Sequence, residues 1–198
     1  MKLLCFSDII TDNSIIFVGD VMLKKMNEKD FDKVFDLMVQ SFPDDERRTY
    51  EDEKALLDNP AFQIYVLPNK DETDVRGFLA VWNFEKFTYF DHFAVNPNYR
   101  NGGIGTKMLT ELVKKFDKTI CLEVEPPETE ITKRRVAFYE RNNFFLNEYD
   151  YMQPPMSEGK SAIPLKIMTC GKHISQAEFE EIKSTLYKNV YGVSPTEY

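Results

Sequence analysis

Apolar residues recur three or four positions apart in several segments of the chain, the spacing that places them on one face of a helix. In the first, second and last of these segments, an Asn, Thr or Ser precedes an acidic residue by three positions, a pattern typical of a helix start. Prolines at positions 43 and 60 end the first two segments. The helices predicted in this way cover residues 27–42, 49–59, 104–116, 131–142 and 175–190.

Between the helical segments lie short runs rich in aromatic and β-branched residues, which predict strands. The predicted strands cover residues 62–67, 77–84, 87–95, 119–124, 144–152 and 164–169. The first three follow one another without a helix between them, so we expect consecutive antiparallel strands. Residues 1–21 are poorly patterned, and Met22 is a candidate alternative start of translation that the sequence leaves open. The fold class predicted is a mixed α/β domain.

Composition and charge narrow the classes of partner. A chain of 198 residues fits one domain with a sizeable core, and its net charge of -8 disfavours nucleic acid and anionic membrane surfaces as partners. The longest uncharged stretch, residues 59–69, is too short to span a bilayer. Three cysteines, Cys5, Cys121 and Cys170, are widely spaced without a metal-binding pattern, so we expect no metal site and a reducing, cytoplasmic location.

The stretch that carries chemistry is a glycine-rich turn between the strand 87–95 and the helix 104–116. The first amide N–H groups of a helix lack partners and carry partial positive charge, so this turn is suited to hold a phosphate. Gly102, Gly103 and Gly105 leave those amides uncovered, and the Thr106 hydroxyl adds a donor. The turn lacks the Walker ending and the dinucleotide-binding spacing, which disfavours nucleotide hydrolysis and NAD chemistry. A turn that merely joins strand to helix is the alternative.

Arg100-x-x-Gly103-x-Gly105, placed after a Val-Asn-Pro strand end, resembles the acyl-CoA pyrophosphate motif of the GNAT superfamily of N-acetyltransferases. Residues 122–124 and 134–144 resemble the later strand, helix and Phe-Tyr-Glu segment of that family. The resemblance implies the GNAT-like acyl-CoA N-acyltransferase fold, a central mixed, mostly antiparallel sheet flanked by helices and splayed open around the cofactor. It predicts a GNAT domain at residues 21–170, an N-terminal extension at 1–20 and a C-terminal helical extension at 171–198.

The resemblance also implies that acetyl-CoA is the cosubstrate, with its pyrophosphate on the glycine turn and its pantetheine along the preceding strand. Tyr139 is implied to donate a proton to the departing CoA thiolate, and the alternative is an aromatic packed in the core. The cofactor-binding residues implied are Phe93, Ala94, Val95, Arg100, Asn101, Gly102, Gly103, Ile104, Gly105, Thr106 and Tyr139. Arg134, Arg135 and Arg141 either meet cofactor phosphates or form a solvated basic face.

Transfer to an amine needs a base, because a lysine-like amine is neutral in only about 4 of 10,000 molecules at pH 7, a penalty of roughly 4.6 kcal/mol. Candidate water-assisted bases are Glu123 first and Asp91 second; a solvated or hydrogen-bonded acid is the alternative for each. Strand alternation predicts Asp91, Phe93 and Val95 on one face and His92 and Ala94 on the other. His92 has a pKa suited to base work, but a structural histidine is favoured.

The sequence therefore predicts an N-acetyltransferase that moves acetyl directly from acetyl-CoA to a primary amine of a small molecule or peptide. The alternative is a noncatalytic acyl-CoA-binding regulatory module. Cys121 as an acyl carrier lacks an evident His partner. The charged run 44–48 borders the acceptor site by analogy or is a solvated face, while Phe87, Tyr149 and Tyr151 wall the cleft or fill the core. The helix at 175–190 covers its own domain or forms a homodimer contact.

At three positions the sequence departs from the family pattern. Asn143 stands where the family usually has glycine, and asparagine enters the left-handed backbone region more easily than most residues. We therefore expect the fold to tolerate this change. Thr132 and Arg135 replace an asparagine and a small residue that are common in the family, which leaves details of cofactor contact open.

Overall fold

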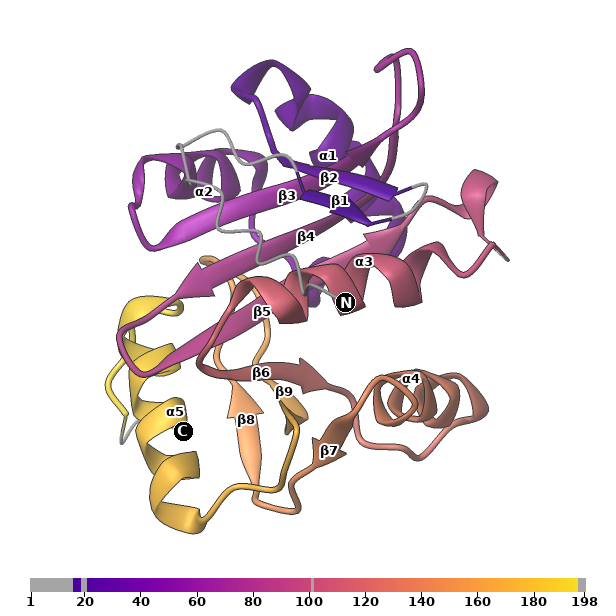
Figure 1. The fold of residues 1–198 in the computed structure, drawn as a ribbon. Helices are drawn as coiled ribbons and strands as arrows, with labels where there is room; N and C mark the ends of the chain where they lie inside the picture. The colour runs from indigo at the N-terminus through magenta and orange to yellow at the C-terminus, as the bar shows by residue number, and fades with distance from the viewer. Residues whose placement is uncertain (1–15, 19–20, 101, 196–198) are drawn as a thin grey trace, which may run out of the picture.

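The computed structural model describes residues 16–18, 21–100 and 102–195, which form a mixed sheet of nine strands with helices on both faces (Figure 1). The strands are β1 (Ile16–Val18), β2 (Val21–Lys25), β3 (Phe62–Pro68), β4 (Val75–Asn83), β5 (Phe87–Val95), β6 (Thr119–Val124), β7 (Phe144–Leu146), β8 (Tyr151–Gln153) and β9 (Ile163–Cys170). The α-helices are α1 (Phe31–Ser41), α2 (Tyr50–Ala55), α3 (Ile104–Lys115), α4 (Glu130–Glu140) and α5 (Gln176–Asn189). Of the twenty residues predicted as an N-terminal extension, all but 16–18 lie outside the described part of the chain.

The sheet order is β1-β2-β3-β4-β5-β6-β9-β7, with β8 paired to β9. All the pairings are antiparallel except that of β5 with β6, which is parallel. This parallel pair is joined only over its first half, since the register ends at Phe90↔Leu122. Beyond that pair the two strands diverge, and the sheet is open at its centre. The predicted mixed, mostly antiparallel sheet is confirmed.

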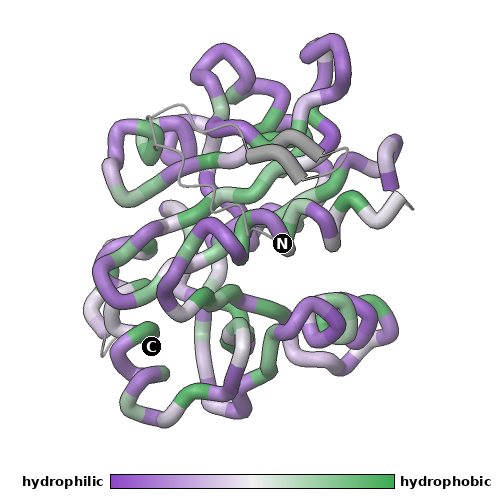
Figure 2. Tube along the Cα trace, in the orientation of Figure 1, coloured by the Kyte–Doolittle hydropathy of each residue, from purple (hydrophilic) through white to green (hydrophobic). Residues whose placement is uncertain are grey.

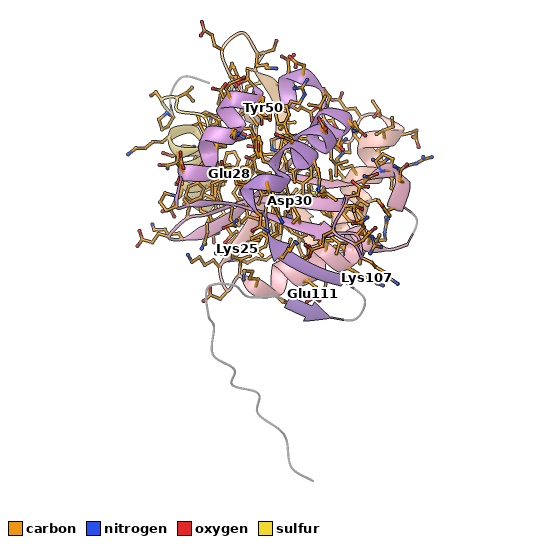
Figure 3. All side chains as sticks on the ribbon, turned by 90° about the horizontal axis from the view of Figure 1, so that it is seen from above. Lys25, Glu28, Asp30, Tyr50, Lys107 and Glu111 are labelled. Carbon is orange, nitrogen blue, oxygen red and sulfur yellow. The ribbon has the colours of Figure 1, made fainter. Side chains whose placement is uncertain are left out.

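The two faces of the sheet carry separate hydrophobic clusters. One cluster joins the sheet to α1 and α5, and the other joins it to α3 and α4. Figure 3 shows this layering from above, with Tyr50 on one side of the strands and Lys107 and Glu111 of α3 on the other. Hydrophobic stretches concentrate on the central strands, whereas the peripheral loops are largely hydrophilic (Figure 2). No helix in the described ranges is long and apolar enough to cross a membrane.

The C-terminal helix α5 is an integral part of the first cluster. Its N-terminus has the predicted capping box, in which Ser175 accepts from the Glu178 amide and Glu178 accepts from the Ser175 amide. Phe179, Ile182 and Leu186 are buried against the chain's own core. The interpretation that this helix covers its own domain is therefore confirmed.

A β-bulge in β5 overturns the predicted alternation of its side chains. Leu79 pairs with Phe93 but Val81 pairs with Phe90, so Asp91 and His92 together stand opposite a single residue of β4. Because a bulge inserts one extra residue, the alternation shifts there. Asp91 therefore shares a face with His92 rather than with Phe93, and its side chain contacts the α1 side of the sheet.

Three further local features correct or confirm the sequence analysis. Residues 16–18 form a strand, β1, although their pattern did not predict one. The strand predicted over residues 144–152 is two strands, β7 and β8; the buried Asn147 between them bonds through its side chain to Ile167 O and Thr169 Oγ1, and through its backbone amide to Ile167 O. Asn143 has a φ of 67°, so it adopts the left-handed conformation expected of it.

Candidate active site

A cleft of about 780 Å³ opens where β5 and β6 part. One end of the cleft is lined by the end of β5, the start of α3 and residues of α4. The other end is lined by the segment after α1, together with Gln153 and Leu165. Diverging parallel strands cannot satisfy each other's backbone groups, so a ligand can reach strand backbone here. The splayed sheet thus creates the site.

At one end of the cleft, the start of α3 presents backbone amides that donate to no acceptor among the described residues. Gly103 is its N-cap in the left-handed conformation, with φ 67°, and the first amide bonded within the helix is that of Lys107, to Gly103 O at 3.0 Å. The amides of Ile104, Gly105 and Thr106 precede that bond. A Cβ on Gly105 would make ordinary van der Waals contact with the Phe138 ring at 3.5 Å, so glycine leaves this approach to the amides without a side chain. This donor set fits a diphosphate.

Most of the predicted cofactor residues meet in this cleft. The predicted cofactor residues that line the cleft are Phe93, Ala94, Val95, Arg100, Gly103, Ile104, Gly105, Thr106 and Tyr139. Gly102 is exposed beside them without lining the cleft, and Asn101 lies outside the described residues. Arg134 and Arg135 also line the cleft, but Arg141 does not.

Tyr139 projects from α4 among aromatic rings. Its ring meets Phe138 and Phe144 edge-on, with centroids 5.2 and 5.8 Å away. Burial raises the pKa of its hydroxyl to about 12, an effect that Arg135 partly opposes. The phenol therefore keeps its proton at neutral pH and is placed in the cleft as a donor.

Glu123, the next-to-last residue of β6, is held by hydrogen bonds from three phenols. Tyr89 donates to its Oε2 at 2.9 Å, Tyr151 donates to its Oε1, and Tyr191 donates to both oxygens at 2.7 and 3.0 Å. Burial raises the pKa of Glu123 to about 7, against the lowering effect of these hydrogen bonds. A carboxyl of this pKa exchanges a proton near neutral pH, as a general base must.

Asp91, by contrast, is an ion-pair partner. Its Oδ2 accepts from Arg48 Nη1 at 3.1 Å and from Trp82 Nε1 at 3.0 Å. Arg48 Nη1 also lies 3.1 Å from Glu53 Oε2, and the side chains of Asp91, Arg48 and Glu53 are 2%, 4% and 0% exposed. Burial alone would raise the pKa of Asp91, but His92 and Arg48 outweigh it and hold that pKa well below its usual range.

His92 is a buried cation within the same cluster. Its Nε2–H donates to Glu46 O at 2.7 Å, and its Nδ1 lies 3.1 Å from Asp91 Oδ1, an ion-pair distance without the alignment of a hydrogen bond. Burial alone would lower its pKa, but Asp91 raises it to about 9. A protonated imidazole has no lone pair to accept a proton, so these contacts favour the structural role.

At the end of the cleft away from α3 stand Phe42, Glu46 and Gln153. Burial, and then Glu125, raise the pKa of Glu46. The charged run 44–48 is thus divided: Glu46 lines the cleft and Arg48 is buried, while Arg47 pairs with the exposed Asp44 at 2.8 Å. The interpretation of the run 44–48 as a solvated face therefore holds for only part of it.

Other predicted candidates lie in the core. Phe87 is buried in the α1-side cluster, and Tyr149 stacks on Phe179 with centroids 4.7 Å apart. Cys121 is fully buried, and burial raises its thiol pKa well above the usual value, so it is not a nucleophile that a substrate in the cleft can reach. Within the described ranges, no group of three or more His, Cys, Asp or Glu is placed to hold a metal ion.

Sequence reasoning missed Tyr89, Tyr191 and Glu53 as parts of the site, and it named Arg48 only as a member of the charged run 44–48. Arg48 lies in a charged run and Glu53 in a short polar helix, where exposure is the ordinary expectation. Tyr191 is 68 positions from Glu123 in the chain, and no local pattern connects the two. Only the folded arrangement brings them together.

Comparison with known proteins gives the same assignment as the geometry. The sequence profile of the acetyltransferase (GNAT) family matches residues 31–144, more than half of the chain. The chain belongs to the GNAT family of acetyltransferases. A solved structure from Bacteroides thetaiotaomicron, named as a GNAT-family acetyltransferase, is 36% identical with a TM-score of 0.79 and covers 87% of this chain and 99% of its own.

A curated relative and more distant structures extend this comparison. YjbC of Bacillus subtilis, a protein named for acetyltransferase activity, is 32% identical over 112 residues, which is 56% of this chain and 55% of YjbC. The match thus spans about half the length of that relative. Spermidine N-acetyltransferase SpeG from Vibrio cholerae (13% identity, TM-score 0.57, 77% and 94% coverage) and the ribosomal-protein-S18-alanine N-acetyltransferase from Escherichia coli (15%, 0.56, 79% and 97%) share the GNAT fold.

Proposed function

We propose that this GNAT acetyltransferase uses acetyl-CoA and moves the acetyl group directly to a primary amine of a small molecule or peptide. The observation that carries the proposal is one continuous cleft that has the free amides of α3 at one end and the carboxylate of Glu123 further in. A diphosphate-binding start of a helix and a neutral-pH base in one cavity are what direct transfer from a CoA thioester to an amine requires.

The cofactor end acts by binding and orientation. The amides of Ile104, Gly105 and Thr106 would hold the pyrophosphate, with Arg100 and Arg134 as neighbouring cations in the cleft wall. The strand ending at Val95 would run alongside the pantetheine. When bound, acetyl-CoA supplies an acyl group activated as a thioester.

Glu123 is proposed as the base that takes the amine proton, directly or through a water. With a pKa of about 7, its carboxyl is largely ionised at slightly alkaline pH yet basic enough to accept a proton. The nitrogen–carbon bond forms as the carbon–sulfur bond breaks, and the amine proton goes to Glu123. Asp91 is the weaker candidate, because its ion pairs with Arg48 and His92 keep its carboxylate ionised and occupied.

Tyr139 is proposed as the acid that protonates the departing thiolate. Its hydroxyl remains protonated at neutral pH and lies in the part of the cleft bordered by α3. The atoms balance: one proton leaves the amine for Glu123, one passes from Tyr139 to sulfur, and the solvent restores both groups.

The alternative is a regulatory module that binds acyl-CoA without catalysis. The test is thiol release from acetyl-CoA by purified protein with a panel of polyamines, amino acids and peptides. Amine-dependent thiol release, with one acetylated amine formed per thiol, is expected. Saturable CoA binding without thiol release for any amine would favour the alternative.

A further inference from the structure

We propose that Tyr191, which follows α5, is a positioning residue for the acetyl transfer: it fixes the plane of the Glu123 carboxylate toward the cleft. The proposal rests on the proposed function of Glu123 as base. Tyr191 lies outside residues 31–144, the part of the chain that the family profile matches. The family assignment therefore gives this residue no role.

The hydroxyl of Tyr191 is shared by both carboxylate oxygens of Glu123. Its hydroxyl is 2.7 Å from Oε2 and 3.0 Å from Oε1, whereas Tyr89 and Tyr151 each reach one oxygen. A donor shared by both oxygens lies near the carboxyl plane and restricts rotation about the last side-chain bond. Because Tyr89 and Tyr151 each also hold one carboxylate oxygen, one orientation of the carboxylate is favoured.

The segment that carries Tyr191 is firmly anchored. Its amide donates to Leu186 O at 3.2 Å, and the preceding carbonyl, Val190 O, lies 3.5 Å from Arg48 Nη2. Leu186 and Val190 are themselves buried in the core. Arg48 thus joins the segment that carries Tyr191 to Asp91, at the point where β5 and β6 diverge.

Several titratable groups face Glu123, and each affects its proton affinity. Tyr151 on β8, Tyr191 after α5 and Tyr89 on β5 stabilise the charged form by hydrogen bonding, while Asp91 on β5 opposes it. The Cys121 thiol, on Glu123's own strand, keeps its proton. All three phenols have pKa values raised well above 10 by burial and then by Glu123, so none titrates near neutral pH. Removing the Tyr191 hydroxyl should raise the pKa of Glu123.

The decisive experiment is a titration of the Glu123 carboxyl by carbon-13 NMR on the full chain with labelled glutamate. The Glu123 signal is assigned as the one lost in Glu123→Gln. Tyr191→Phe keeps the ring but loses the hydroxyl, and we expect its midpoint to lie about one pH unit above that of the wild type. An unchanged midpoint would overturn the proposal.

Tyr187→Phe is the matched control. Tyr187 lies on α5, is fully buried, and donates its hydroxyl to Met152 O rather than to Glu123. It should lose thermal stability as much as Tyr191→Phe or more, yet keep the wild-type midpoint. An equal shift in both variants would assign the effect to general loosening of α5 and contradict the proposal.

Kinetics complete the test. In Tyr191→Phe, the acid limb of the kcat profile should shift by the same amount as the carboxyl midpoint, and kcat at pH 7 should fall about fivefold with the KM for acetyl-CoA unchanged. An unchanged kcat profile alongside a shifted carboxyl would mean that Tyr191 does not act in catalysis. If the wild type releases no thiol with any amine, the proposed function fails, while the NMR titration still decides whether Tyr191 controls Glu123.

Discussion

Asp91 and Glu123 stand one position beyond the last pair of β5 and β6, Phe90↔Leu122, and the Tyr89 hydroxyl is within 3.5 Å of both carboxylates. Both side chains are buried, yet their pKa values move in opposite directions. Asp91 faces the cations Arg48 and His92, which favour its charged form, whereas Glu123 is bonded by neutral phenols and faces the Asp91 carboxylate, which disfavours its charged form. Two carboxylates on neighbouring strands thus have different chemistry because their partners differ.

This difference suggests a division of labour. The Asp91 cluster is a fixed ionic anchor that joins the segment after α1, α2 and β5, and it contributes to the architecture of the cleft. Among the described residues no cation is paired with Glu123, so this carboxyl retains the ability to exchange a proton. The carboxylate proposed as the base is therefore distinguished as much by the absence of neighbouring positive charge as by its position.

The strongest test of this comparison is Glu123→Gln. The amide keeps the shape but cannot take a proton, so kcat should fall by about a hundredfold to ten-thousandfold while CoA affinity is retained. In the wild type, kcat should decline as the pH falls below about 7, because protonated Glu123 cannot act as a base. Steady-state kinetics from pH 5.5 to 9 measure both effects, with the exposed α5 residue changed as Glu180→Gln for comparison.

The second test removes the anchor cation. Arg48→Met leaves Glu53 and Asp91 buried without their shared partner, which should lower the free energy of unfolding by about 3–5 kcal/mol. The neighbouring change Arg47→Met affects a pair with the exposed Asp44 and should cost less than about 1 kcal/mol. Urea unfolding of both variants decides the matter. Equal losses in the free energy of unfolding would show that the buried cluster contributes no more to stability than the pair of Arg47 with the exposed Asp44.

The third test uses the pH dependence of stability. The folded-state pKa of His92, about 9, lies above its unfolded value of 6.5, so its contribution is complete below pH 6.5 and disappears as the pH rises through 9. The shift corresponds to roughly 3 kcal/mol over that window. His92→Gln should flatten the decline in the free energy of unfolding between pH 7 and 9.5. A decline as steep as in the wild type would place the titrating group elsewhere.

The smallest effect is expected at the proton donor. Tyr139→Phe retains the ring that packs on Phe138 and Phe144 but removes the hydroxyl, so kcat should fall by about a hundredfold with little change in the dissociation constant of CoA. Rapid-quench and calorimetric measurements separate the two. Unchanged turnover would remove Tyr139 from the acid role and leave it as a core aromatic.

The glycine turn at one end of the cleft, which is proposed to bind the cofactor, could be predicted from the sequence because it is local. The turn from Arg100 to Thr106 lies within seven positions, and the donors it offers are backbone amides at the start of a helix. Helical spacing and caps likewise predicted α3 and α5. Fold and cofactor end thus depend on short-range patterns that a sequence displays directly.

The catalytic end could not be predicted to the same depth, for two physical reasons. The bulge at Asp91 and His92 shifts the alternation of β5, and bulges leave little trace in a strand's composition. The environment of Glu123 depends on phenols from β5, β8 and the segment after α5, which converge only in the folded chain. Sequence identified the carboxylates but not the partners that distinguish them.

Isothermal titration of coenzyme A into the folded, purified protein is the most direct measurement of whether the cleft holds the proposed cosubstrate. The exposed amides at the start of α3 and the open split in the sheet predict saturable heat with one coenzyme A bound per chain. If protein shown to be folded by circular dichroism and cooperative unfolding gave no binding heat, the cleft would not be a coenzyme A site.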